Sequence, residues 1–319
     1  MLEVLQEGSL RALLAWTLGM LLFPFFIRWQ RAQSLGQKIK KEGPALHLHK
    51  ENTPSMGGVI VALAAFLSAF LWPPAPDTPF VLFLCGFLLL GFLDDFWKSA
   101  LHRPWGWKAR YRFLVELLLA CGMMWWGKDV IPPSLVVPFT GKVLALGPAA
   151  LFLYGVFVLL ASCNAFNITD GLDGLAGGCG ILTLIFFGVL LGYLGRASFA
   201  FLSFAFVGGL LAFLWFNSWP AEIFLGDSGS LPIGAFIGFC ALASGYSLFL
   251  PLAGVVFVVD TLSVILQVVS FRLFGRRLFL MSPLHHHFEL RGKKEVRVTA
   301  HLWLIQALGV TLAFLGVRG

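Results

Sequence analysis

The chain has 319 residues, of which 58% are hydrophobic and only 12% charged, and its mean hydropathy is +0.85. Soluble domains carry about 25% charged residues, and a single core in a chain of this size could not hide so much apolar surface from water. Composition therefore excludes a soluble globular protein, and it excludes disorder because disordered chains are poor in hydrophobic residues. The formal charge of +7 is typical of basic loops on membrane proteins, so we expect a membrane lipid environment and no nucleic-acid partner.

The predicted fold is all-α, a polytopic integral membrane protein with about ten transmembrane helices. Runs of about 17 to 25 apolar residues are long enough to cross ~30 Å of hydrocarbon as helices. Only Ser247 and Pro251 mark a turn between the eighth run and the ninth. Because no internal repeat is visible, we expect a single transmembrane catalytic domain over residues 1–319. The predicted spans are residues 9–28, 55–72, 79–97, 112–127, 148–164, 177–194, 198–216, 229–246, 248–270 and 300–317.

Basic residues cluster in connections of one parity. The connections after the first, third and ninth predicted spans hold 18 of the 23 Lys and Arg residues. Positively charged loops face the cytoplasm, so these connections should be cytoplasmic and both termini should lie on the periplasmic or extracellular side. The residues concerned are Arg28, Arg31, Lys38, Lys40, Lys41, Lys50, Lys98, Arg103, Lys108, Arg110, Arg112, Arg272, Arg276, Arg277, Arg291, Lys293, Lys294 and Arg297.

Acidic residues stand where this rule would place basic ones. Asp94 and Asp95 end the third predicted span in LLLGFLDDFWK, and Lys98, one helical turn further on, can offset part of their charge. They could be an acidic cap at the bilayer boundary, but two acids at a helix C-terminus oppose the macrodipole, which favours a functional role. Asp227 lies in GDSG between the seventh and eighth spans. Because Mg²⁺ prefers carboxylate and phosphate oxygens, Asp94 and Asp227 are candidate metal ligands.

The connection after the fifth span, NAFNITDGLDGLAGG, contains no Lys or Arg. Its Asn164, Asn167, Asp170 and Asp173 recur every three residues. In a helix their oxygens would share roughly one face, and the neighbouring glycines would allow a ligand to approach closely. A polar, glycine-rich loop with Asx turns is the alternative interpretation. An EF-hand is excluded because the twelve-residue loop with its final Glu is missing.

Cationic candidates lie in two connections on the same side. SPLHHHFEL contains His285, His286 and His287, of which one or two could donate hydrogen bonds to a phosphate, although all three could be structural. Lys50, before TPSMGG, is the lysine that we expect to bind a phosphate, although such lysines also bind anionic lipid headgroups. Carboxylates for Mg²⁺ combined with Lys, Arg and His are typical of phosphoryl transfer, and a site at the bilayer surface can accept a lipid.

Six motifs in this order resemble the phospho-N-acetylmuramoyl-pentapeptide transferase family. They are TPSMGG, LGFLDDFWK, NAFNITDGLDGLAGG, FNSWPAEIFLGDSGSLPIG, DTLSVILQV and SPLHHHFELRG, spread from about residue 47 to residue 300. The DD and NxxD features are shared with the wider polyprenyl-phosphate N-acetylhexosamine-1-phosphate transferase superfamily. TPSMGG and HHHFE point to the muramoyl-pentapeptide branch.

The resemblance implies a reaction and a location. Undecaprenyl phosphate would attack the β-phosphate of UDP-MurNAc-pentapeptide with Mg²⁺ as cofactor, giving lipid I and UMP in peptidoglycan synthesis. The enzyme would be a multi-pass protein of the bacterial cytoplasmic (inner) membrane with its active site on the cytoplasmic face. We favour direct attack over a covalent aspartyl intermediate, because direct attack needs one inversion and no second nucleophile. The oligomeric state stays open, with a homodimer as one option.

The resemblance also implies residue roles. Asp94 would be the base or anchor for the lipid phosphate, with Asp95 beside it, Asp227 would bind Mg²⁺, and His285 would contact phosphates or the leaving group. The chain departs from the family at Arg112, where Lys is usual, and at Asp260, where Glu is usual. The residues implied to bind substrate are Lys50, Asn167, Asp170, Asp173, Asn217 (diphosphate), Phe224 (stacked on uracil), His286 and Arg112.

Two other functions stay open. A sibling transferase would attach GlcNAc-1-phosphate, or another hexosamine phosphate, to a polyprenyl carrier. A cation-coupled transporter of an anionic solute would also use acids and bases within the membrane. Transporters of that kind place these charges near the bilayer midplane on interrupted helices of two related halves, whereas here the charges cluster at one surface.

Overall fold

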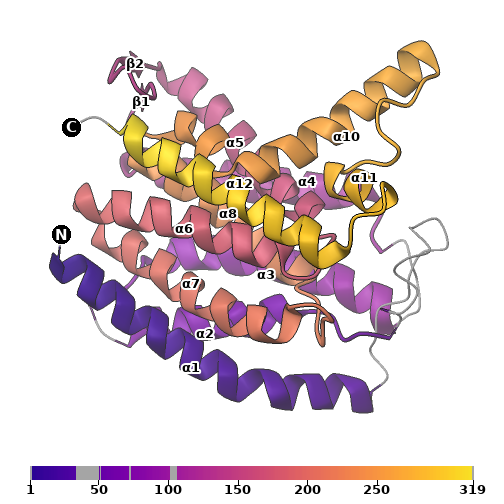
Figure 1. The fold of residues 1–319 in the computed structure, drawn as a ribbon. Coiled ribbons are helices and arrows are strands. Elements are labelled where there is room, and N and C mark those ends of the chain that lie inside the picture. Colours follow the sequence, from indigo (N-terminus) through magenta and orange to yellow (C-terminus); the bar gives the residue numbers. More distant parts are fainter. Residues whose placement is uncertain (1, 34–49, 51, 72, 101–105, 318–319) are drawn as a thin grey trace.

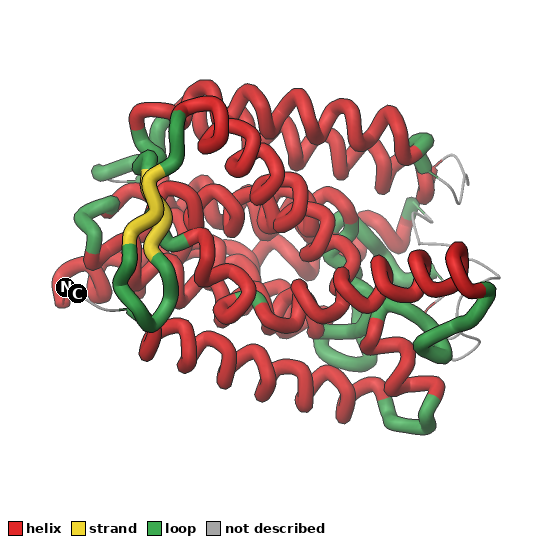
Figure 2. The backbone as a smooth tube through the Cα atoms, turned by 90° about the horizontal axis from the view of Figure 1, so that it is seen from above, coloured by secondary structure: helices red, strands yellow, loops and turns green. Residues whose placement is uncertain are grey.

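The computed structural model describes residues 2–33, 50, 52–71, 73–100 and 106–317 of the chain. The predicted basic residues Lys38, Lys40, Lys41 and Arg103 lie outside the described residues. The fold is a bundle of long helices with one small β-hairpin (Figures 1 and 2). The prediction that the fold is built of helices is therefore confirmed, apart from the hairpin.

Local sequence explains where several helices begin and end. Pro148 opens α5 at a position where the missing N–H costs nothing, and Gly275 adopts the left-handed conformation that ends α10. The helices are α1 (Leu2–Ala32), α2 (Gly57–Phe70), α3 (Thr78–Ala100), α4 (Ala109–Trp126), α5 (Pro148–Thr169), α6 (Leu175–Tyr193), α7 (Ala197–Asn217), α8 (Asp227–Ser244), α9 (Leu250–Ala253), α10 (Val255–Phe274), α11 (Leu284–Leu290) and α12 (Glu295–Gly316). Short 3-10 turns cover Gly127–Asp129 and Ser247–Phe249.

Seven helices of the described chain are long and apolar enough to cross a membrane: α1, α3, α5, α6, α7, α10 and α12. This number supports a multi-pass membrane protein. The helix α2, with 14 residues, is shorter than a full span, and α4 carries Arg110, Arg112 and Glu116. Nine of the ten predicted spans coincide with one helix each, and the ninth covers more than one element.

Two features differ from the predicted elements. The ninth predicted span, 248–270, is not one helix, because Ser247–Phe249 and α9 precede a break at Gly254 before α10 begins. The second is an antiparallel hairpin of β1 (Ser134–Val136) and β2 (Val143–Ala145), which the sequence analysis did not predict. Its strands have three residues each, too short for a clear alternating pattern.

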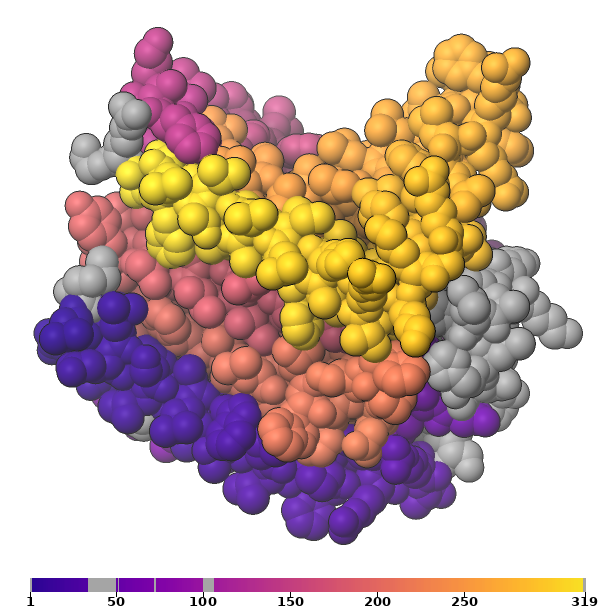
Figure 3. All heavy atoms as spheres, in the orientation of Figure 1, coloured from indigo at the N-terminus to yellow at the C-terminus, as the bar shows by residue number. Residues whose placement is uncertain are grey.

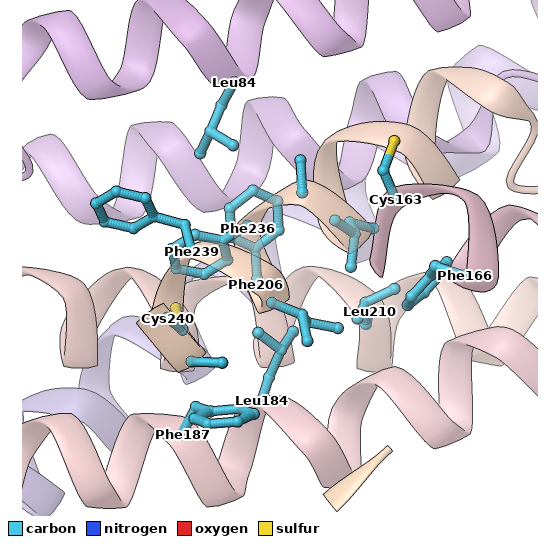
Figure 4. Packing of buried hydrophobic residues seen from close by; sticks show 14 of the residues in the cluster. Leu84, Cys163, Phe166, Leu184, Phe187, Phe206, Leu210, Phe236, Phe239 and Cys240 are labelled. Atoms are coloured by element: carbon cyan, nitrogen blue, oxygen red, sulfur yellow. The ribbon is translucent and has the colours of Figure 1, made fainter. Parts of the chain in front are cut away.

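The helix α8 lies at the centre of the bundle. All of its residues from Asp227 to Ser244 are buried, and it contacts α2, α3, α5 and α6. Figure 4 shows Phe236, Phe239 and Cys240 of α8 among aromatic and aliphatic side chains of neighbouring helices. The rings of Phe236 and Phe206 lie 5.1 Å apart. Because α8 is packed on every side, its first residue, Asp227, is held in a fixed place.

The two termini lie at the same end of the bundle, and the C-terminus is near the hairpin (Figures 1 and 2). The far end of α10 stands away from the other helices, and its surface is rich in exposed apolar side chains such as Leu273 and Phe274 (Figure 3). In a bilayer such side chains contact lipid and need no protein partner. Termini at one end agree with an even number of crossings.

Candidate active site

Asp95 holds the N-terminus of α8 against the last turns of α3. Its Oδ1 accepts the backbone N–H of Asp227 at 3.0 Å, and its Oδ2 accepts that of Ser228 at 2.9 Å. The first N–H groups of a helix lack partners within the helix and form the positive end of its dipole, so a carboxylate is favourable there. Asp95 opposes the dipole of its own helix but complements that of α8. This contact fixes the position of Asp227.

Asp94 and Asp227 converge on one ammonium group. Lys98 Nζ lies 2.5 Å from Asp94 Oδ2 and 2.9 Å from Asp227 Oδ2. The other oxygen of Asp94 accepts the backbone N–H of Trp107 at 2.6 Å. Two predicted site residues that are far apart in the sequence thus share one cation.

Arg112 completes this cluster from α4. Its Nε lies 2.9 Å from Glu116 Oε1, its Nη1 lies 2.8 Å from Asp227 Oδ2, and its Nη2 donates to Asn167 Oδ1 at 3.1 Å. Asn167 in turn donates to Asp227 Oδ1 at 2.6 Å, and Asn164 donates to Glu116 at 2.8 Å. The fixed fork of a guanidinium can bridge several groups in this way, which the single nitrogen of a lysine cannot do with the same geometry.

Glycines bring the helices of the cluster close together. A Cβ on Gly58, in TPSMGG, would overlap the backbone of Gly229 in α8. A Cβ on Gly91 of α3 would likewise overlap the carbonyl group of Asp227. Without side chains, α2 and α3 can approach the first turn of α8 at backbone distance. The glycines of TPSMGG therefore have a structural role in placing Asp227.

The connection after α5 is divided between helix and turn. The helix ends at Thr169, so Asn167 remains helical, whereas Asp170 and Asp173 lie in the turn that precedes α6. Burial raises the pKa of Asp170 to about 8, and the negative charges of nearby carboxylates, that of Asp227 first, act in the same direction. The raised pKa favours the neutral form of Asp170, which can donate a hydrogen bond, although the N–H of Gly226 acts in the opposite direction.

A second cluster forms around Lys50. Its Nζ lies 2.7 Å from Asp173 Oδ1 and 2.5 Å from Glu295 Oε1, and all three side chains are buried. The other oxygen of Asp173 accepts the N–H of Ala221 at 3.0 Å. In this structure two carboxylates share the charge of Lys50.

Asn217 and Phe224 lie on the segment between α7 and α8. Asn217 Oδ1 accepts the N–H of Gly174 at 2.8 Å, and its Nδ2 donates to the carbonyl of Ile223 at 2.8 Å. The Asn217 side chain therefore ties the turn before α6 to the segment before α8. The ring of Phe224 is half-buried, and the backbone N–H of Phe224 donates to the carbonyl of Pro54 at 2.8 Å.

His285 forms a buried pair with Asp260. Its Nδ1 lies 2.8 Å from Asp260 Oδ2, and its backbone N–H donates to Asp260 Oδ1 at 3.3 Å. A carboxylate can only accept here, so Nδ1 carries the hydrogen and Nε2 of the neutral ring has the lone pair. That Nε2 is buried without a hydrogen-bond partner in the described chain, and a Cβ on Gly171 would meet it at 2.5 Å. It therefore faces the turn that contains Asp170.

The neighbouring histidines have different partners. His286 Nδ1 lies 2.8 Å from Glu289 Oε2, whereas His287 Nδ1 accepts the backbone N–H of Leu280 at 3.1 Å. An Nδ1 that accepts leaves the hydrogen on Nε2, so His285 and His287 are held in opposite tautomers.

A pocket of about 690 Å³ opens beside the Asp94 cluster. The indole N–H of Trp107 is buried there with no acceptor among the described residues. The pocket brings basic side chains, carboxylates and hydrogen-bond donors together, which suits an anionic group that binds with a cation. It is lined by Asp94, Lys98, Trp107, Lys108, Ala109, Arg112, Phe113, Glu116 and Asn164.

The donor set of Asp94 and Asp227 fits a hard divalent cation. Two carboxylates that approach one ammonium group already form a cation site, and Mg²⁺ commonly takes one or two carboxylates together with water and phosphate oxygens. Among the described residues no group of three or more His, Cys, Asp or Glu is arranged to hold a metal. The protein alone therefore offers an incomplete coordination shell, which substrate oxygens would have to complete.

Sequence reasoning missed three residues of these clusters. Glu116 could have been found, because it follows Arg112 by four residues and such pairs meet on a helix. Glu295 and Trp107 carried no usable signal, because they lie 122 and 13 residues from their partners Asp173 and Asp94, which matches no local helical spacing.

Comparisons with known proteins agree with the motifs. The family model described as "Glycosyl transferase family 4" matches residues 78–245, from α3 to α8. The phospho-N-acetylmuramoyl-pentapeptide-transferase of Caldanaerobacter subterraneus is 40% identical over 315 residues, with 98% of this chain and 99% of that protein covered. The protein of the same name from Moorella thermoacetica is 42% identical over 324 residues, with 99% and 98% covered. That from a Thermoanaerobacter species is 38% identical over 314 residues, with 98% and 99% covered. The chain therefore belongs to the phospho-N-acetylmuramoyl-pentapeptide-transferase family.

Proposed function

We propose that this protein transfers phospho-MurNAc-pentapeptide from UDP-MurNAc-pentapeptide to undecaprenyl phosphate, forming lipid I and UMP for peptidoglycan synthesis. The names of its relatives support the transferred group. The observation that carries the proposal is the convergence of Asp94 and Asp227 on Lys98, with Arg112 beside them. Such a mixture of acids and bases suits a reaction between two phosphate-bearing substrates.

The reaction joins two polyanions. An oxygen of the lipid phosphate attacks the β-phosphorus of the nucleotide sugar, the bond from that phosphorus to the bridging oxygen breaks, and UMP leaves with that oxygen. Because one phosphoanhydride replaces another, the main task of the protein is to hold the two anionic groups in line. Lys98 and Arg112 provide positive charge at the first cluster, and Lys50 provides it at the second.

Direct attack by the lipid phosphate suits these contacts better than a covalent aspartyl intermediate. Asp94 accepts from Lys98 and from the N–H of Trp107, while Asp227 accepts from Lys98, Arg112 and Asn167. Both oxygens of each carboxylate are bound to the protein in this way, so a route that needs no carboxylate nucleophile is the simpler one. Asp94 would instead anchor the lipid phosphate or take its proton.

Asp94 and Asp227 would hold Mg²⁺, which when bound neutralises oxygens of the diphosphate. The chain's own residues would do the rest. Arg112 keeps the Asp227 carboxylate in place through its 2.8 Å contact, and Asp95 fixes the backbone of the same residue. His285 would exchange a proton with a phosphate or the leaving group at Nε2, because Asp260 holds its Nδ1.

The nucleotide sugar would bind along the connection after α5. Lys50 and His286 would contact phosphates, Asn217 would help to arrange the diphosphate, and Phe224 would stack on uracil. Further polar contacts to the nucleotide and sugar would come from Asn167, Asp170 and Asp173. The half-buried ring of Phe224 and the buried Lys50–Asp173 pair support this placement.

The topology that fits this function has ten crossings in one catalytic domain. The helices α2, α4 and α8 would cross the membrane in addition to the seven long apolar helices, which gives ten crossings. Both termini would be periplasmic or extracellular. The two clusters would lie on the cytoplasmic face of the bacterial inner membrane. Cysteines introduced by Lys142→Cys and Lys293→Cys test this arrangement in intact cells. An impermeant thiol reagent should label the first and not the second, and the reverse pattern would overturn the orientation.

The function is tested by UMP release from the purified protein in detergent. Release should require Mg²⁺, undecaprenyl phosphate and UDP-MurNAc-pentapeptide together. Asp94→Asn, Asp227→Asn and His285→Ala should each abolish release while the protein stays folded, whereas Asp129→Asn, at an exposed position after α4, should not. Wild-type turnover by any two of the three site variants would remove the site assignment.

The same assay separates the alternatives. Turnover of UDP-GlcNAc in place of UDP-MurNAc-pentapeptide would support the sibling transferase. Turnover in detergent, where no ion gradient exists, would exclude a gradient-driven transporter. Uptake of an anionic solute by sealed vesicles without any UMP release would support the transporter.

A further inference from the structure

One face of α12 is hydrogen-bonded to the turn that carries Asp173. Glu295, Thr299 and Trp303 are spaced four residues apart and therefore lie on the same side of the helix. Glu295 Oε1 accepts the backbone N–H of Asp173 at 2.8 Å, and Thr299 Oγ1 donates to the Asp173 carbonyl at 3.3 Å. Trp303 Nε1 donates to the carbonyl of Gly174 at 3.2 Å.

These contacts leave the turn no free backbone group. The remaining N–H, that of Gly174, donates to Asn217 Oδ1 at 2.8 Å. All four backbone polar groups of Asp173 and Gly174 are thus bound by side chains from α12 or α7. Gly174 has φ of 78°, a conformation open to glycine, so the turn does not form from helical propensity alone. The side chains around it add to two backbone bonds, from the N–H of Leu175 to the Leu172 carbonyl and from the N–H of Gly178 to the Gly174 carbonyl.

The fixed turn determines where the Asp173 carboxylate points. One of its oxygens contacts Lys50 and the other accepts the N–H of Ala221. Polar side chains on a membrane helix are costly, and three of those on α12 bind this turn, although Glu295 Oε1 also contacts Lys50 Nζ. Packing alone would not require them, because apolar side chains could fill the same space.

We propose that Glu295, Thr299 and Trp303 of α12 are positioning residues that set the Asp173–Gly174 turn, and through it the affinity for the nucleotide-sugar substrate. The inference rests on the proposed function, since Asp173 and Lys50 are assigned there to this substrate. None of the three residues touches the reacting phosphates. The helix α12 therefore acts on substrate binding and not on the chemical step.

The test replaces the hydrogen-bonding atoms one at a time. Glu295→Ala removes the acceptor for the Asp173 N–H and should raise the KM for UDP-MurNAc-pentapeptide about tenfold, with kcat changed less than about twofold. Glu295→Gln keeps an acceptor oxygen and should restore most of the affinity. Thr299→Val and Trp303→Phe should each raise this KM about threefold, because their bonds are longer. The KM for undecaprenyl phosphate should stay at the wild-type value.

The chain offers a matched control on the same helix. Thr311→Val removes a hydroxyl that donates only to the carbonyl of Ala307 within α12, at 2.9 Å. This variant should leave both KM values unchanged. If Thr299→Val behaves like Thr311→Val, or if Glu295→Gln is as impaired as Glu295→Ala, the positioning role is overturned. A loss of kcat without a change in KM would overturn it as well.

Hydrogen exchange supplies a readout that does not depend on activity. In the wild-type protein in detergent, the amides of Asp173 and Gly174 should exchange slowly, and Glu295→Ala should speed exchange of the peptide that contains them by at least tenfold. Unchanged exchange would contradict the inference even if KM rises. If the wild-type protein releases no UMP but exchange responds as expected, the proposed function fails and the role of α12 in shaping the turn stands.

Discussion

The substitution Gly58→Ala tests whether backbone contact between α2 and α8 places the active-site carboxylate. A Cβ at this position would overlap the N and Cα atoms of Gly229 and would lie 2.7 Å from the carbonyl carbon of Ser228. All of these atoms belong to the backbone, so rotation of a side chain cannot relieve the overlap. One of the two helices has to move.

The size of the movement follows from contact distances. Carbon atoms that do not bond approach to about 3.5–4.0 Å, so α2 and α8 must separate by about 1 Å or more. The displaced segment of α8 begins with Asp227, whose carboxylate lies 2.8 Å from Arg112 and 2.9 Å from Lys98. A misplacement of about 1 Å can cost about 100-fold in rate. Overpacking itself should lower the free energy of unfolding by about 1–3 kcal/mol.

The assay compares kcat for UMP release with the thermal unfolding midpoint in detergent. Gly147→Ala is the matched control, because a Cβ there meets no atom within 4 Å and the residue has φ of −65°, which alanine adopts without strain. Gly58→Ala should lose about 100-fold in kcat and remain folded, while Gly147→Ala should keep both values. Full activity of Gly58→Ala, or an equal loss in both variants, would refute the reasoning.

Three further substitutions probe other contacts. Asp260→Asn removes the carboxylate that holds Nδ1 of His285 and should reduce kcat for UMP release about 100-fold, with little change in the thermal unfolding midpoint. An unchanged kcat would contradict the role of His285 in proton exchange. Arg112→Lys keeps a charge beside Asp227 and should lower kcat/KM by no more than about tenfold, whereas Arg112→Met should lower it more than 100-fold. A larger loss of kcat/KM in Arg112→Lys than in Arg112→Met would exclude a mainly electrostatic role. Arg11→Met leaves two loop carbonyls unpaired and should lower the free energy of unfolding by about 2 kcal/mol, measured by thermal denaturation, with kcat/KM unchanged.

Hydropathy predicted the helices because the bilayer imposes their length. Nine of the ten predicted apolar runs coincide with one helix each, since backbone groups in lipid must pair within the same segment. The break at Gly254 was missed because the residues around it stay apolar, so that hydropathy does not fall where the helix ends. The hairpin of β1 and β2 was missed because it lies outside the apolar runs and its strands have three residues each.

Charge patterning located the acidic residues but not their partners. Asp227 stood out because its connection has no Lys or Arg, and Asp94 because it and Asp95 are adjacent acids at the end of an apolar helix. Their shared contact with Lys98 depends on how α3 and α8 cross, which no local pattern encodes. The spacing of Asp170 and Asp173 suggested one continuous helical face, but α5 ends before both residues, so they reach their partners from a turn.

The charge balance of the first cluster explains why a divalent cation and anionic substrates would bind there together. Among the described residues, the ion pairs of Asp94, Asp227 and Glu116 involve only Lys98 and Arg112, so carboxylates outnumber basic side chains. Asp95 does not add to this excess in full, because the N-terminus of α8 offsets its charge. The excess negative charge would repel a diphosphate that arrived without a counter-ion. A bound Mg²⁺ would reverse the sign of the local charge. The nucleotide sugar should therefore bind weakly without Mg²⁺, although Lys50, Lys98 and Arg112 lie in the two clusters.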